Sequence, residues 1–93
     1  MTFLMLGKYT SESAKGISRE RTGKATAVVK NLGGQVTSMY ALMGQHDVAL
    51  IIEFPGVNEA MKASVALSRL TGIGFETAPA VPVDEFDEMA GEA

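Results

Sequence analysis

The sequence has 93 residues, a net charge of -3 and 46% hydrophobic residues, which fits one globular domain spanning residues 1–93. It contains no cysteine and only one histidine, which excludes disulfide frameworks, thiol catalysis and Cys/His zinc sites, so we expect neither a metal nor a cofactor. The acidic balance also argues against nucleic-acid binding, because nucleic-acid-binding proteins carry a basic surface.

The first half of the chain predicts a strand followed by a helix. Apolar residues run almost without interruption over Phe3–Tyr9, which is typical of a strand buried on both faces. Apolar residues then recur at spacings of three and four until Gly33–Gly34, where we expect the helix to end. Because Gly16 and Gly23 disfavour helix, the part before Ser18 is expected to be a loop or a short separate turn.

The middle of the chain predicts a hairpin and a second helix. The segments Gln35–Met43 and Asp47–Phe54 contain many strand-forming residues, and Gly44 between them can adopt a positive φ. We therefore expect the two strands to pair as an antiparallel hairpin. The second helix is expected to have Asn58 as its N-cap and to end at Gly72.

The end of the chain predicts a fourth strand and a short acidic helix. Ile73–Val81 reads as a strand, and Pro79 and Pro82 place its far end at a sheet edge or a strand terminus. We expect Asp84–Met89 to form one helical turn that lies on the body, with solvated carboxylates, because these residues lack the spacing of a calcium loop. Residues 90–93 are expected to fray.

This order of elements predicts an α+β fold of the ferredoxin-like βαββαβ type. Such a fold has a four-stranded antiparallel sheet with both helices on one face, here followed by a short C-terminal helix. The other face is left bare, although Phe3–Leu6 and Val48–Ile52 are apolar at every position. We therefore predict that a second copy covers it, which gives a face-to-face homodimer, a dimeric α+β barrel.

Alternation along the strands assigns side chains to the two faces. On the third strand, Ala49, Ile51 and Glu53 share one row, which we expect to face the dimer interior or its mouth. Glu53 is then expected either to reach water at the rim or to meet a cation such as Lys8 or Arg69.

On the second strand, strict alternation places Tyr40 in one row with Val36. The sequence leaves open which row of this strand faces the helices.

Four short segments together resemble a known family. They are Leu6–Thr10, Lys15–Ile17, Leu32–Gly34 and Gly44–Val48. These segments resemble the GYD-domain family of small prokaryotic proteins, and the match spans nearly the whole chain. Members of that family carry Gly-x-Tyr-Asp at the hairpin, and His46 stands here where tyrosine is usual. The family is similar to the dimeric α+β barrel superfamily, and its hairpin looks like the Gly-x-x-Asp turn of Lrp/AsnC effector-binding domains, so the resemblance implies the same fold.

Residues at the strand ends and the hairpin are the candidate ligand-binding set. They are Lys8, Tyr9, Tyr40, His46, Asp47 and Glu53. The lysine and the tyrosines suit an anionic or aromatic ligand, although tyrosines at strand ends also act as interface anchors.

His46 is the candidate catalytic residue, because histidine is the residue type that most readily exchanges a proton near neutral pH. Asp47 can orient an imidazole or bind turn amides. Neighbouring residues on a strand point to opposite faces, so a direct pair between His46 and Asp47 is awkward.

The sequence is compatible with three functions. We favour a non-catalytic homodimer, or a higher homo-oligomer, that acts as a ligand-binding or regulatory module with an apolar site between its facing sheets or at their ends. Its ligand is expected to be a small apolar or aromatic compound. The alternative is a cofactor-independent enzyme of the dimeric α+β barrel type that uses His46 in proton transfer. The third is an assembly subunit without a ligand.

The apolar segments also bear on location. Met1–Leu6 is shorter than the apolar part of a secretory signal, and Val48–Ile52 is far below the ~20 residues that cross a bilayer. We therefore expect a cytoplasmic protein without membrane contact.

Overall fold

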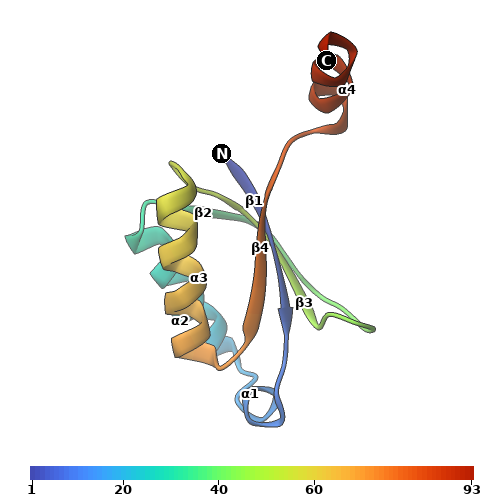
Figure 1. Ribbon diagram of the computed structural model, residues 1–93. Helices are drawn as coiled ribbons and strands as arrows, with labels where there is room; N and C mark the ends of the chain where they lie inside the picture. Colours follow the sequence, from blue (N-terminus) through green and yellow to red (C-terminus); the bar gives the residue numbers. More distant parts are fainter.

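A computed structural model describes residues 1–93. One antiparallel sheet forms its centre, with the strand order β2-β3-β1-β4. The strands are β1 (Thr2–Lys8), β2 (Gln35–Ala41), β3 (Val48–Glu53) and β4 (Gly74–Ala80). Helices α2 (Arg19–Asn31) and α3 (Val57–Thr71) both lie on one face of this sheet (Figure 1). The predicted ferredoxin-like α+β fold is confirmed.

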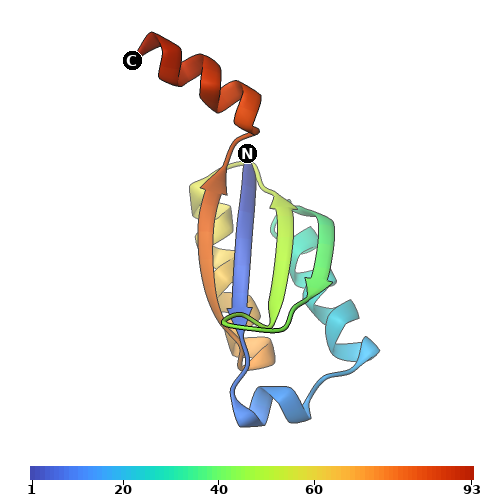
Figure 2. The same ribbon diagram turned by 90° about the vertical axis from the view of Figure 1, so that its right-hand side faces the viewer.

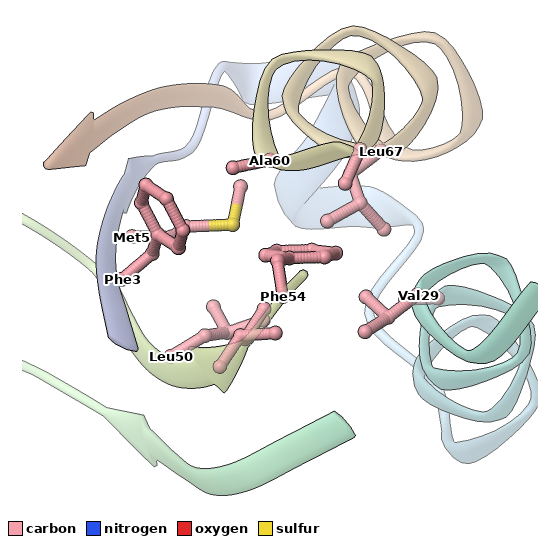
Figure 3. Packing of buried hydrophobic residues seen from close by; sticks show 10 residues of the cluster. Phe3, Met5, Val29, Leu50, Phe54, Ala60 and Leu67 are labelled. Carbon is pink, nitrogen blue, oxygen red and sulfur yellow. The ribbon is translucent and has the colours of Figure 1, made fainter. Parts of the chain in front are cut away.

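The hydrophobic core lies between the sheet and these two helices. On β1, Phe3 pairs with Ile52 of β3, and Met5 pairs with Leu50, so the side chains of all four point to the helix side. The rings of Phe3 and Phe54 meet edge to face, with centroids 5.9 Å apart. Figure 3 shows how the buried side chains from the sheet meet those from α2 and α3. The residues labelled there are Phe3, Met5, Val29, Leu50, Phe54, Ala60 and Leu67.

Glycines end both long helices, as their positions in the sequence predict. Gly33 has φ 81° and Gly72 has φ 74°, a left-handed conformation that residues with a Cβ rarely adopt. Gly44 in the hairpin loop also has a positive φ, 133°. The backbone reversals expected at these three positions are confirmed.

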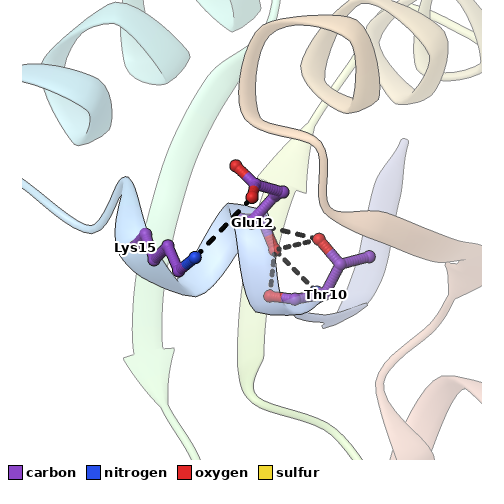
Figure 4. Close-up of polar contacts among 4 residues, drawn as sticks. Thr10, Glu12 and Lys15 are labelled. Atoms are coloured by element: carbon purple, nitrogen blue, oxygen red, sulfur yellow. Dashed lines mark hydrogen bonds and ion pairs between the residues drawn. The ribbon is translucent and has the colours of Figure 1, made fainter.

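A separate short helix, α1 (Ser11–Lys15), lies between β1 and α2. Thr10 caps it with a reciprocal pair of bonds, in which Ser13 N donates to Thr10 Oγ1 and Thr10 N donates to Ser13 Oγ (Figure 4). Ser18 then caps α2 by accepting a hydrogen bond from Arg21 N at 3.0 Å. The separate turn expected before Ser18 is therefore confirmed.

The start of α3 differs from the prediction. Gly56, not Asn58, is the N-cap, and the helix begins at Val57. The amide of Ala60 already bonds to the carbonyl of Gly56, so the helical hydrogen bonds begin before Asn58.

Strand β2 also differs, because a bulge interrupts its alternation. Val36 pairs with Ile52, but Ser38 pairs with Ile51, so two steps along β2 match one step along β3. Val36 therefore faces the helices while Tyr40, which pairs with Ala49, faces the opposite side. The prediction that Val36 and Tyr40 share a row is wrong because the bulge adds one residue between them. The strand also ends at Ala41, before Met43.

The C-terminal helix differs most from what the sequence predicts. Helix α4 (Val83–Glu92) has ten residues, and none of them is buried. It stands beyond the end of the sheet, on the side away from α2 and α3 (Figures 1 and 2). The prediction of one turn over Asp84–Met89 lying on the body is wrong. Pro82 has an extended conformation (φ -57°, ψ 145°) and restricts Val81 before it, and this stiff connection carries the helix outward.

Candidate functional site

The sheet face opposite the helices is the candidate site. Two rows of side chains cross its centre from β2 to β4. One row is Ser38, Ile51, Leu4 and Ala78, and the next is Tyr40, Ala49, Leu6 and Glu76. No element of the chain covers these rows, as Figure 2 shows with the helices behind the sheet. The β3 row that contains Glu53 thus faces away from the helices, as alternation predicts.

The hairpin loop closes one end of this face. It runs across the end of β1 (Figure 2), where Asp47 N donates to the carbonyl of Gly7 at 2.8 Å. Tyr9 N in turn donates to Asp47 Oδ2 at 2.7 Å. Asp47 therefore binds a backbone amide beyond its own turn, and it anchors the loop to the residues that follow β1.

Polar groups of both charges gather at this closed end. His46 Nε2 lies 3.5 Å from Glu76 Oε2 of β4, and the imidazole is 23% exposed whereas the carboxylate is 77% exposed. Lys8 Nζ donates to the carbonyl of Gln45 at 3.1 Å. An imidazole, a carboxylate and an ammonium group thus gather around Leu6 at this end of the face.

The opposite end of the face holds Glu53. Its carboxylate accepts a hydrogen bond from Thr2 Oγ1 and is exposed, so it reaches water at the rim. It forms no ion pair with Lys8 or Arg69. Lys8 ends β1 while Glu53 pairs with its first residue, which separates their backbones by about 20 Å.

Tyr9 lies apart from the open face. The guanidinium carbon of Arg21, from α2, lies 5.9 Å from the centroid of its ring. Of the six predicted residues, Lys8, Tyr40 and His46 border the same end of the face, and Asp47 holds the loop there. Tyr9 and Glu53 lie elsewhere.

Glu76 is the site residue that sequence reasoning missed. It reaches His46 because the register pairs Leu6 with Glu76 across β1 and β4. His46 lies in the loop between β2 and β3, whereas Glu76 lies on β4. The register of β4 against β1 has no signature in the sequence of either strand. The one available signal was alternation along β4, which puts Glu76 in a row with Gly74 and Ala78.

The fold and this face define the class of protein: a ferredoxin-like α+β domain with one apolar sheet face left uncovered by its own chain. The family model of the GYD domain matches residues 3–90, and the chain belongs to the GYD-domain family. Comparison with curated proteins finds no match. None of the four helices combines the length and apolar character that spanning a membrane requires.

Proposed function

We propose that this GYD-domain protein is a cytoplasmic homodimer that binds a small apolar or aromatic molecule between its two facing sheets or at their ends. The observation that carries the proposal is the uncovered face, with Leu4, Leu6 and Ile51 at its centre. Exposed apolar patches of this kind on a folded chain mark interaction or ligand-binding sites. Complete burial of one such leucine or isoleucine stabilises a folded state by about 1.5–3 kcal/mol.

The small size of the cavity inside a single chain supports a ligand site between two copies. The cavity between the helices and the sheet has a volume of about 50 Å³, which suits a few water-sized molecules rather than a metabolite. Two sheets that face one another pack about 10 Å apart, which leaves room for a flat molecule wherever facing side chains are small, as Ala49 and Ala78 are.

The closed end of the face supports a ligand with one polar group. Tyr40 is 58% exposed, so its ring is free to stack on an aromatic body. Lys8 and His46 border the same end and can donate hydrogen bonds to an oxygen of the ligand. The proposed ligand class is therefore an apolar or aromatic body with an oxygen-bearing, uncharged or anionic end.

The test combines assembly with ligand-induced stabilisation. A panel of small aromatic and apolar acids is screened by thermal unfolding, and a true ligand stabilises by about 2.7 kcal/mol at 100 times its Kd. Ile51→Asp places a charge at the centre of the face, and we expect it to abolish both the face-to-face contact and the stabilisation by ligand. Ala27→Asp on the exposed side of α2 is the matched control, expected to keep both. Stabilisation that survives Ile51→Asp contradicts a site between the sheets.

The contact between His46 and Glu76 favours one alternative, a cofactor-independent enzyme acting by proton transfer. Glu76 lies beside Nε2, and Nδ1 is left to take or give a proton. If a panel compound is turned over, His46→Gln is expected to abolish the rate, and a rate that this substitution leaves unchanged contradicts proton transfer by His46. An absence of both turnover and thermal shift supports a subunit that serves assembly alone.

A further inference from the structure

Helix α4 carries an apolar stripe that its own chain does not cover. Val83, Phe86 and Met89 are spaced three apart and are 73%, 57% and 46% exposed. At ten residues, α4 is shorter than the ~12–15 residues that an isolated helix needs to be stable in water. The helix therefore requires a surface to pack against.

A matching apolar groove lies between α3 and β4. It has a volume of about 400 Å³, and Phe3 and Pro79 form its floor on the sheet side. Val57, Met61 and Val65 line its helix side at spacings of four, and they are 49%, 63% and 50% exposed. Val57, Met61 and Val65 form an apolar stripe on α3 about 12 Å long, and the stripe on α4 from Val83 to Met89 is about 9 Å long. The two lengths are similar enough for one stripe to cover the other.

The charges beside the two stripes are complementary. Helix α4 carries five carboxylates and no basic residue. Lys62 and Arg69 flank the exposed stripe of α3, and neither takes part in an ion pair within the chain. A docked α4 therefore places carboxylates beside two unpaired cations.

The connection to α4 determines which copy provides the groove. Only Val81 and Pro82 separate β4 from α4, and Pro82 favours an extended path through both. Figure 1 shows α4 on the side of the sheet away from α3, and thus away from the groove of its own chain. A short, stiff connection of this kind favours exchange of an element between copies.

We propose that α4 of one copy docks in the groove between α3 and β4 of a second copy. Phe86 and its stripe cover Met61 and Val65 there, and the acidic side of α4 meets Lys62 and Arg69. The groove lies on the helix side of the sheet, so this contact is separate from the face-to-face dimer and does not depend on it.

Cysteine cross-linking tests the contact, because the chain has no native cysteine. Full-length Phe86→Cys and Met61→Cys variants are mixed and oxidised with diamide, and the mixed disulfide is measured by mass spectrometry. Thiols held at an interface meet at an effective concentration near 1 mM, so we expect linkage at least about tenfold faster than for free chains. Glu88→Cys, on the opposite side of α4, is the matched control and is expected to link at the slow rate.

The double variant Met61→Cys with Phe86→Cys separates exchange from docking within one chain. Exchange predicts disulfide-linked pairs, whereas a disulfide inside one chain overturns the proposal. Equal rates for Phe86→Cys and Glu88→Cys also overturn it. Circular dichroism of each reduced variant verifies that the substitutions leave the fold intact. Neither contrary result bears on the dimer through the open face, which Ile51→Asp tests separately.

Discussion

His46 Nε2 lies 3.5 Å from Glu76 Oε2, and this contact joins the β2–β3 hairpin loop to β4 across the end of β1. The pair adds little to the stability of the fold, because Glu76 is 77% exposed and water screens the attraction. We expect His46→Gln and Glu76→Gln each to change the free energy of unfolding by less than about 1 kcal/mol. Urea denaturation measures it, and a larger loss means that the contact is structural.

Asp47 is expected to matter more to stability than His46. Its carboxylate accepts a hydrogen bond from Tyr9 N at 2.7 Å in a partly buried position. Hydrogen bonds to charged groups contribute about 1.5–3 kcal/mol, so Asp47→Ala is expected to destabilise by that amount. Asp47→Asn keeps an acceptor, so its free energy of unfolding, measured by urea denaturation, is expected to lie between those of the parent and of Asp47→Ala. An Asp47→Ala protein as stable as the parent contradicts the anchoring role.

Gly7 has no space for a side chain. A Cβ added there lies 2.6 Å from Val48 Cγ1 and 2.8 Å from Phe75 Cε1. Gly7→Ala is therefore expected to destabilise the chain by about 1–3 kcal/mol through overpacking.

The matched control, Gly23→Ala, has the opposite expected sign. A Cβ at Gly23 meets nothing within 4 Å, and the residue lies inside α2. Alanine there is expected to stabilise by up to about 1 kcal/mol, because it has the higher helix propensity. Thermal unfolding of the two variants side by side measures both. A Gly7→Ala variant at least as stable as the parent contradicts the close packing at Gly7.

Much of the fold is predictable because hydrophobic pattern and glycine position specify it locally. The apolar run at the start of β1, the stops at Gly33 and Gly72, and the hairpin around Gly44 each follow from a few neighbouring residues. The uncovered face also follows from the sequence, since two helices can cover only one side of the sheet.

The features that escaped prediction depend on contacts between distant segments. The bulge between Val36 and Ser38 reverses one row of β2, and nothing in Gln35–Ala41 marks it. The pairing of His46 with Glu76 depends on the register of β4 against β1. The outward course of α4 depends on the short connection through Val81 and the extended Pro82, whereas the apolar spacing of Phe86 and Met89 suggested docking on the same chain.

Native mass spectrometry of the protein from its own host tests the central claim most directly. The claim is that a second copy covers the sheet face built on Leu4, Leu6 and Ile51. We predict a mass of at least twice the 9.8 kDa chain, with a retained small molecule, and Ile51→Asp is expected to lose both the small molecule and the face-to-face contact. A folded single chain at micromolar concentration, with no added mass, contradicts the claim.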